Sequence, residues 1–306
     1  MTNCERLPDS GGALRPLVSI GIPTYNRAAG LEKAVKSVLD QQYLNVEVTI
    51  SDNASSDDTK AMVERLWRAE PRVRYYRQER GVPPGENFAR ARSGASGKYF
   101  MWLADDDWLG TGFLSTCVEA LEADPSLVLV SGSTRYYREH KFLFDAKVIS
   151  LEQTSRCQRV LEYYRQVGDN GIFYGLMRRE ATGAIHMPNR IGGDWFFIAD
   201  LAFLGKVKSL PEIVLHRDYT WDEQSAAKLA AASNLHGLER DLPYLAIANG
   251  AFRRIWQEQP VYQQLSPPVR WWLAARSWRI ICRRNKLGIG RLSSAWLRSK
   301  RIPNPR

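Results

Sequence analysis

Three consecutive aspartates, Asp105, Asp106 and Asp107, directly follow the apolar segment 99–104. Their carboxylates repel one another, and no basic residue follows closely in the sequence to balance them. Hard divalent cations, bound through one or two carboxylates with phosphate supplying further oxygens, relieve such repulsion. A solvated turn in which one aspartate caps the next helix is the structural alternative. The run therefore predicts either a metal and phosphate site or a capped turn.

A second acidic position, Asp52, lies where the apolar segment 46–51 ends. A carboxylate there can accept hydrogen bonds from a nucleobase N–H or from ribose hydroxyls. Asp52 comes too early to cap the helix that follows, and Asp57 or Ser56 is the better candidate for that cap. We therefore interpret Asp52 as a nucleotide-binding candidate.

The first apolar segment closes with Pro23, Thr24, Tyr25 and Arg27. Its backbone and the Tyr25 ring can border a nucleotide, and Arg27 can bind a phosphate. The local pattern is equally typical of an ordinary turn.

Short apolar runs alternate with helical stripes from residue 17 to residue 131, which is typical of βαβ units and of a parallel sheet covered on both faces. Ligands of such sheets bind beyond the carboxyl ends of the strands, where the residues above gather. The expected strands are 17–22, 46–51, 73–77, 99–104 and 127–131, and the expected helices are 28–40, 57–69, 86–94 and 113–123.

The pattern loosens between residues 132 and 190, where we expect short aromatic-rich strands and one helix near 154–166. A helix over 194–204 and a strand over 212–216 follow, and the chain is predicted to be helical over 222–234, 243–257 and 268–286. We expect an N-terminal tail over 1–16, an α/β domain over 17–220 and a helical C-terminal region over 221–306.

Together these residues resemble the family 2 glycosyltransferases. The resemblance begins with VSIGIPTYNR at 18–27, continues with SVLDQQ at 37–42 and SDNASSDDT at 51–59, and ends at the aspartate run. Gly81, Asn87 and the sequence GKY at 97–99 also fit the pattern. It covers residues 17–131, is thinner over 190–225 and is absent afterwards.

The resemblance implies a GT-A fold with a Rossmann-like, mostly parallel sheet, a nucleotide-diphosphate sugar donor, and Mn²⁺ or Mg²⁺. It implies metal ligation by Asp105 and Asp107, although Ala104 stands where many members have a further aspartate. Which oxygen meets the metal stays open, and Asp106 is a further candidate. The donor-binding positions that it implies are Pro23, Thr24, Tyr25, Arg27, Asp52, Asn53, Asn87, Asp105 and Asp106.

Inverting sugar transfer needs a carboxylate that takes the proton of the acceptor hydroxyl. The resemblance implies such an aspartate at a helix start about 90 residues after the metal motif, and Asp194 after Gly192 and Gly193 fits. Asp194 as a helix cap alone is the alternative. Asp200, inside the same predicted helix, is the weaker candidate for the base.

His216 follows an apolar segment near the end of the α/β domain. Relatives complete the metal shell with a histidine in this late strand, and imidazole is an acceptable ligand for Mn²⁺. Ordinary hydrogen bonding by a lone histidine is the alternative. We therefore consider His216 a candidate third metal ligand.

The formal charge of the 306 residues is +10, but it is unevenly distributed. Residues 259–306 contain eleven basic side chains and no acid, which leaves 32 basic against 33 acidic residues in the rest. On a helical projection of 268–286, Trp271, Ala274, Ala275, Trp278, Ile281 and Cys282 share a face, with Arg276, Arg279, Arg283 and Lys286 along its flank.

Aromatic residues beside arginines are typical of a helix that lies in a membrane interface, where each basic residue contributes about 1 kcal/mol near an anionic leaflet. We expect contact with an anionic membrane through Trp271, Trp278, Arg276, Arg279 and Arg283, in a tail over about 266–306. A helix that packs on the body is the alternative, and nucleic acid is not an expected partner because no nucleic-acid module is present.

Four widely spaced cysteines and a polar N-terminus predict a cytoplasmic protein. The basic, tryptophan-containing tail adds the expectation that the protein is peripheral at the inner face of the cell membrane. The expected function is metal-dependent, inverting transfer of a hexosyl or deoxyhexosyl unit to a glycan or lipid-linked glycan acceptor in surface polysaccharide synthesis. A sugar nucleotidyltransferase and an inactive membrane or nucleic-acid adaptor are the alternatives.

Overall fold

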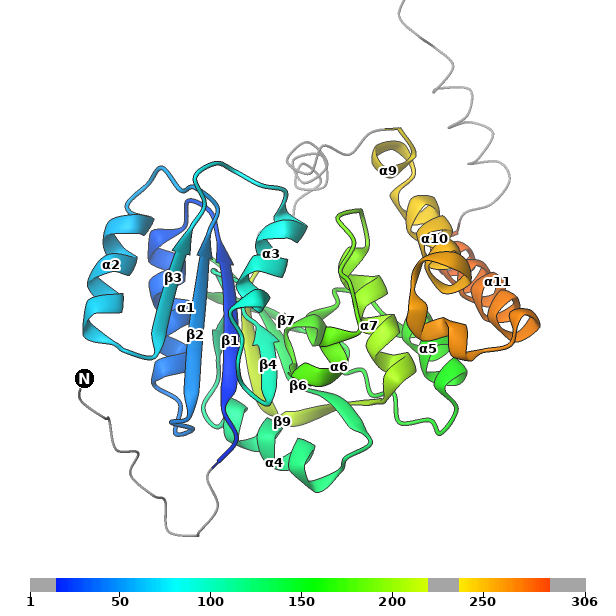
Figure 1. Cartoon of the computed structure of the whole chain (residues 1–306), viewed down its shortest axis with the longest axis horizontal. Helices are drawn as coiled ribbons and strands as arrows, with labels where there is room; N and C mark the ends of the chain where they lie inside the picture. The colour runs from blue at the N-terminus through cyan, green and yellow to red at the C-terminus, as the bar shows by residue number, and fades with distance from the viewer. Residues whose placement is uncertain (1–14, 220–236, 287–306) are drawn as a thin grey trace, which may run out of the picture.

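A computed structural model of the chain describes residues 15–219 and 237–286. Its strands form one mixed sheet with the order β3-β2-β1-β4-β8-β6-β9-β5, and β7 pairs with β6 outside this path. Helices cover both faces of the sheet, and the C-terminal helices lie at the end of the molecule away from β3 (Figure 1). The expected α/β architecture is thereby confirmed.

The first half of the sheet is parallel. β1 (Val18–Thr24) pairs with β2 (Val46–Asp52) and with β4 (Tyr99–Trp102), and β2 pairs with β3 (Val73–Arg77). β1 and β2 are buried throughout, as expected for strands covered on both faces. The register aligns Thr24 with Asp52, so the polar ends of these strands meet at one edge.

The second half of the sheet is mixed. β6 (Leu127–Arg138) and β9 (Lys206–Asp218) run parallel, whereas β5 (Trp108–Leu109), β7 (Lys141–Asp145) and β8 (Leu176–Arg178) pair antiparallel with their neighbours. β6 and β9 extend well beyond the predicted apolar runs at 127–131 and 212–216. Apolar patterning missed these extensions because their side chains alternate between buried and partly exposed.

Two apolar cores lie on opposite faces of the sheet. The residues of β4 show the division, because Tyr99 and Met101 join one core and Phe100 and Trp102 join the other. The first core is covered by α1 (Ala28–Leu39), α2 (Thr59–Ala69) and α4 (Phe113–Ala123). The second is covered by α3 (Pro84–Ser93), α5 (Arg156–Gln166), α7 (Gly193–Leu204), α10 (Pro243–Arg253) and α11 (Pro267–Arg284).

The C-terminal helices pack directly on α7. Ile247 of α10 lies against Gly192, whose φ of +74° places it in the left-handed region that favours glycine. Arg254 forms a buried ion pair with Asp200 of α7, with Nη2 and Oδ2 2.6 Å apart. This pair gives Asp200 a structural partner, in agreement with its lower rank as a candidate base. The predicted helix over 222–234 lies outside the described residues.

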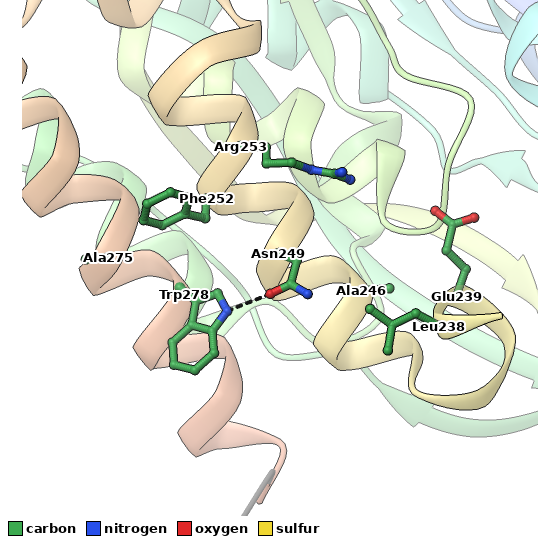
Figure 2. A pocket seen from close by; sticks show the side chains of 8 residues that line it. All are labelled: Leu238, Glu239, Ala246, Asn249, Phe252, Arg253, Ala275 and Trp278. Carbon is green, nitrogen blue, oxygen red and sulfur yellow. Dashed lines mark hydrogen bonds between the residues drawn. The ribbon is translucent and has the colours of Figure 1, made fainter. Parts of the chain in front are cut away.

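A cavity of about 690 Å³ opens between α9 (Leu238–Asp241), α10 and α11 (Figure 2). Trp278 lies at its edge and donates a 2.8 Å hydrogen bond from Nε1 to Oδ1 of Asn249. Leu238, Ala246, Phe252 and Ala275 add apolar lining.

The helix α11 has two apolar sides. Leu273, Ala274 and Ile281 are buried against the body, together with Ser277 and Cys282. Trp271 is 54% exposed and Trp278 37% exposed, so these rings do not share the buried face. The projection grouped them with Ala274 because it could not show that α5 and α10 both cover part of this helix. No helix in the described ranges is long and apolar enough to cross a membrane.

Candidate active site

The end of β1 is joined to the aspartate run by direct hydrogen bonds. Thr24 Oγ1 donates to Asp105 Oδ2 at 2.8 Å, and the Tyr25 backbone N–H donates to the same oxygen at 3.4 Å. Arg27 Nη1 lies 2.5 Å from Asp106 Oδ2. The Tyr25 side chain is 57% exposed and its ring is available to a ligand. The structure thus brings four of the predicted donor-binding residues together around Asp105.

Asp107 is fully buried, and its two oxygens have different surroundings. Oδ2 accepts a 2.7 Å hydrogen bond from Nε of Arg217, whereas Oδ1 has no hydrogen-bond partner in the described structure. Burial raises the pKa of Asp107 to about 7. Burial, followed by the nearby Asp106 charge, raises the pKa of Asp105 to about 6. Unbalanced buried carboxylates of this kind mark a site that favours a cation.

Arg217 is a site residue that the sequence did not single out. Its guanidinium lies 4.5 Å from the ring centroid of Tyr174, and its Nη1 donates to the Tyr136 hydroxyl at 3.3 Å. β9 places it opposite Asp107, since Trp108 of β5 pairs with His216. The adjacent His216 drew attention in the sequence, but neighbouring residues of a strand point to opposite faces. This alternation along the strand is the sequence signal that could have identified Arg217 as a candidate.

Asp194 lines a cavity of about 310 Å³ that is also lined by Arg217, Tyr174 and Asn170. It lies in the first turn of α7, as expected, and its Oδ2 accepts a 2.8 Å hydrogen bond from Asn170 Nδ2. Tyr163 in turn donates to Asn170 Oδ1 at 2.8 Å, which fixes the amide orientation. Burial raises the pKa of Asp194, partly opposed by the Asn170 hydrogen bond. The cavity therefore presents a carboxylate whose basicity is increased.

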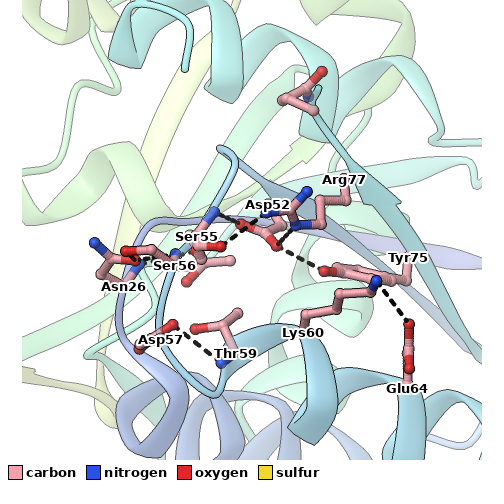
Figure 3. A network of polar contacts seen from close by, with 12 residues as sticks. Asn26, Asp52, Ser55, Ser56, Asp57, Thr59, Lys60, Glu64, Tyr75 and Arg77 are labelled. Carbon is pink, nitrogen blue, oxygen red and sulfur yellow. Dashed lines mark hydrogen bonds and ion pairs between the residues drawn. The ribbon is translucent and has the colours of Figure 1, made fainter. Parts of the chain in front are cut away.

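Asp52 is buried at the end of β2 within a network of protein donors (Figure 3). Its Oδ1 accepts from the Ser55 backbone N–H at 2.8 Å, and its Oδ2 accepts from the Tyr75 hydroxyl at 2.6 Å. Arg77 Nε lies 3.4 Å from Oδ2. These contacts fix the loop after β2, and a nucleobase N–H has only the remaining lone pairs available.

The two predicted cap residues, Ser56 and Asp57, lie in the same loop, but the N-cap position of α2 is Asp58, whose side chain makes no cap hydrogen bond. Asp57 Oδ1 accepts a 3.0 Å hydrogen bond from the backbone N–H of Thr59, the first residue of α2 (Figure 3). Ser56 instead donates its backbone N–H to Asn26 Oδ1 at 2.7 Å. Of the two cap candidates, Asp57 is therefore the residue that satisfies a helix N–H.

Asn53, Asn87 and Pro23 have protein contacts that support the site. Asn53 Oδ1 accepts from the Val82 backbone N–H at 2.7 Å and its Nδ2 donates to the Val82 carbonyl at 2.9 Å. Asn87 is buried and its Nδ2 donates to the Ser51 carbonyl at 3.1 Å. Pro23 is buried within β1. In the structure these three residues position the strand ends and the adjoining loop.

β9 pairs His216 with Trp108, at the end of the aspartate run, but among the described residues its side chain contacts none of the three aspartates. Its ring stacks on Trp108 at 5.1 Å, and its Nδ1 lies 2.9 Å from the Tyr137 hydroxyl. A Cβ at Gly110 would lie 3.4 Å from His216 Nε2, so that nitrogen is directed along β5 beyond Trp108. Burial lowers the pKa of His216, which favours a neutral imidazole.

The carboxylates fit a divalent cation without help from a histidine. In the described parts of the chain, no three His, Cys, Asp or Glu side chains gather as a metal centre. Mg²⁺ and Mn²⁺, however, accept few protein carboxylates together with water and substrate phosphates. The unpartnered Oδ1 of buried Asp107 is an oxygen donor suited to such an ion. The group therefore fits a metal that is completed by its substrate.

Comparisons with known proteins identify the family of the chain. The sequence model of glycosyl transferase family 2 matches residues 19–185. The GalNAc(5)-diNAcBac-PP-undecaprenol β-1,3-glucosyltransferase of Campylobacter jejuni is 39% identical over 237 residues, which is 76% of this chain and 73% of that protein. The hyaluronan synthase of Pasteurella multocida is 34% identical over 225 residues, 72% of this chain but only 22% of that protein.

Solved glycosyltransferases share the fold. TarS 1-349 of S. aureus, in complex with UDP-GlcNAc, superimposes with a TM-score of 0.56 over 87% of this chain and 89% of that one, at 14% identity. The mannosyltransferase PcManGT of Pyrobaculum calidifontis, in complex with GDP-Man and Mn²⁺, has a TM-score of 0.55 over 86% of this chain and 74% of that one, at 17% identity. The fold is thus of the GT-A type, and the chain belongs to glycosyl transferase family 2 and is a glycosyltransferase.

Proposed function

We propose that this glycosyltransferase moves a sugar from a nucleotide-diphosphate sugar to a hydroxyl of a lipid-linked glycan, with inversion at the anomeric carbon, in the synthesis of a bacterial surface polysaccharide. The observation that carries the proposal is the cavity shared by Asp194 and Arg217, because Arg217 also contacts Asp107. This contact links the proposed proton acceptor, Asp194, to the proposed metal-binding carboxylates. The acceptor class is that named for the C. jejuni relative.

In this mechanism Asp194 accepts the proton of the acceptor hydroxyl, and the resulting oxygen bonds to the anomeric carbon. The bond between that carbon and the donor diphosphate breaks on the opposite side, so one bond forms as one breaks. Asn170 holds Asp194 in place through its 2.8 Å hydrogen bond. The raised pKa of Asp194 makes it a stronger proton acceptor than an exposed aspartate.

We propose that Asp105 and Asp107 hold Mn²⁺ or Mg²⁺, with Oδ1 of Asp107 as one ligand. When bound, such an ion neutralises charge on the departing diphosphate. Thr24 orients Asp105 by donating to its Oδ2, and Tyr25 is proposed to stack on the nucleobase. The His216 side chain contacts Trp108 and Tyr137. We therefore propose only Asp105 and Asp107 as protein ligands of the metal.

Product analysis tests the proposal. Purified protein is incubated with a panel of nucleotide sugars, a lipid-linked glycan acceptor and Mn²⁺, and the released nucleotide is identified. Acceptor-dependent release of a nucleoside diphosphate, with an anomer of inverted configuration in the product by NMR, is the expected result. Release of pyrophosphate would identify a nucleotidyltransferase instead. No turnover with any donor, from folded protein, would favour the inactive adaptor.

We further propose that α11 contacts an anionic membrane and places the enzyme at its lipid-linked acceptor. The helix exposes Trp271, Trp272 and Trp278 on one side of its buried stripe, beside the exposed Arg276 and Arg279. Amphipathic tryptophan rings and cationic side chains are the two components of interfacial binding. The basic residues beyond Lys286 lie outside the described residues.

Vesicle co-sedimentation tests this part of the proposal. We expect the full chain to bind vesicles with phosphatidylglycerol more tightly than vesicles of phosphatidylcholine alone, with salt weakening the difference. Replacing Trp271 and Trp272 with alanine removes exposed rings without touching the buried stripe, so binding falls while the melting temperature is kept. As a matched control, Trp67→Ala removes a ring of 52% exposure from α2 and leaves vesicle binding unchanged. Equal binding by all three proteins would contradict a role for α11.

A further inference from the structure

Arg217 has more hydrogen-bonding capacity than the ion pair with Asp107 uses. Its Nε donates to Asp107 and its Nη1 donates to Tyr136. Among the described residues, none accepts a hydrogen bond from Nη2. The side chain is only 18% exposed, and Arg217 is one of the residues that line the cavity that holds Asp194. A half-saturated guanidinium in a closed site is a strong candidate for binding an anion.

A second buried arginine shows what a purely structural pair looks like in this fold. Arg254 donates to Asp200 through both Nε and Nη2, and also to the carbonyl of His186. Gln259 adds a further donor to the same Asp200 oxygen, and neither Arg254 nor Asp200 lines either of the two cavities described above. Arg254 Nη1 likewise has no acceptor among the described residues, so the difference is one of place: Arg217 lines the cavity that holds Asp194.

The surroundings of Arg217 hold the guanidinium plane in place for binding. Tyr174 lies beneath it, with its ring centroid at 4.5 Å, and Tyr136 flanks it at 5.7 Å. Asp107 fixes its Nε edge at 2.7 Å. Because these three contacts restrict the Arg217 side chain, it loses little conformational entropy when an anion binds. Hydrogen-bond donors that are already in position before the reaction also stabilise developing charge most effectively.

We propose that Arg217 binds the diphosphate of the sugar donor and stabilises the charge that develops on it as the glycosidic bond breaks. The inference rests on the proposed function, which places that diphosphate between the aspartate run and Asp194. Arg217 reaches both places, because it pairs with Asp107 and lines the cavity of Asp194. The diphosphate keeps the electron pair of the broken bond, and the guanidinium interacts with its oxygens without exchanging a proton.

The experiment measures nucleotide affinity without turnover. Isothermal titration calorimetry with UDP and UMP, and in parallel GDP and GMP, is carried out on the full chain at pH 8 in EDTA, so that no metal contributes. We expect Arg217→Met to weaken binding of the nucleoside diphosphate by about tenfold or more, the typical value of a charge-assisted hydrogen bond. Binding of the monophosphate is expected to stay unchanged, and Arg217→Lys to fall between.

Two variants separate binding from a general structural effect. Asp107→Asn keeps Arg217 and removes a negative charge, so diphosphate affinity in EDTA is expected to be retained or increased. Arg254→Met breaks the structural pair with Asp200 and is expected to lower the melting temperature without a selective loss of diphosphate affinity. If Arg217→Met does not fold, the comparison of Arg217→Lys with Asp107→Asn still decides the question.

Each outcome bears on a different claim. Equal losses of diphosphate and monophosphate affinity in Arg217→Met, or no loss of either, would overturn the assignment of Arg217. Farnesyl diphosphate is titrated as a soluble prenyl diphosphate. A loss confined to that compound would show that Arg217 binds the acceptor's diphosphate and would refute the donor assignment. Failure of the wild-type protein to bind any nucleotide, in EDTA and again in a parallel titration with Mn²⁺, would instead count against the proposed function.

Discussion

Replacing the proposed base, Asp194, with asparagine is expected to reduce turnover without reducing the stability of the folded protein. In Asp194→Asn the introduced amide oxygen can still accept the hydrogen bond from Asn170 Nδ2. The ability to take a proton is lost, however, and general base catalysis contributes about 10²–10⁴-fold to such reactions. We therefore expect the variant to lose turnover by about that factor while its donor affinity remains close to that of the wild type.

The pKa of Asp194 gives the direction of the stability change. Its folded-state pKa is raised above the value of 3.8 by burial. The folded protein therefore holds this proton more tightly than the unfolded chain does, and the ionised carboxylate lowers stability at pH above the raised pKa. That cost disappears as the pH falls through the folded pKa toward 3.8. Asp194→Asn also removes a negative charge that is favourable in the first turn of α7, and this loss reduces the stability gained by the variant by only about 0.3–1 kcal/mol.

The assay combines melting curves with kinetics across pH. We expect the Asp194→Asn variant to melt no lower than the wild type at pH 8, with any advantage vanishing toward pH 4. For the wild type, kcat/KM should fall tenfold per pH unit below the raised pKa, since the base must be ionised. Turnover by Asp194→Asn within tenfold of the wild type would refute the base assignment. A large drop in its melting temperature at pH 8 would refute the electrostatic reasoning.

Four further substitutions test other parts of the site. Asp52→Asn should lower the free energy of unfolding by about 1–3 kcal/mol in urea titrations, because its carboxylate satisfies three protein donors. Asp107→Asn should weaken Mn²⁺ binding, followed by electron paramagnetic resonance, whereas His216→Ala should not; the reverse pattern would restore His216 as a ligand. Tyr25→Ala should weaken nucleotide binding by about 1–3 kcal/mol if its ring stacks on the base, and unchanged affinity would exclude the stacking.

The strand-and-helix alternation of the first 131 residues predicted the parallel part of the fold well, because short segments rich in β-branched and aromatic residues alternate with helical stripes and are separated from them by turn signals. The strand 73–77 and the helix 113–123 were located to the residue. The longer β6 and β9 were underestimated because tertiary pairing, which propensity cannot show, extends both of them. The short β5 and β8 depend on their partners in the same way.

Within the site, local sequence predicted which residues end strands but not how they pair across the sheet. Thr24 and Asp105 are 81 positions apart, and only the parallel register of β1 and β4 brings them together. Arg217 was overlooked because its partner Asp107 lies 110 positions away. The helix α11 was located within one or two residues at each end, but its buried face depends on neighbours that a projection does not contain.

The most direct test of the account is to identify the nucleotide product in the presence and absence of a lipid-linked glycan acceptor, using wild-type protein and Asp194→Asn side by side. The account predicts that the wild type releases a nucleoside diphosphate only when acceptor is present, and that the variant binds the donor but releases almost none. Release of pyrophosphate, or equal release by the variant, would contradict sugar transfer by this site.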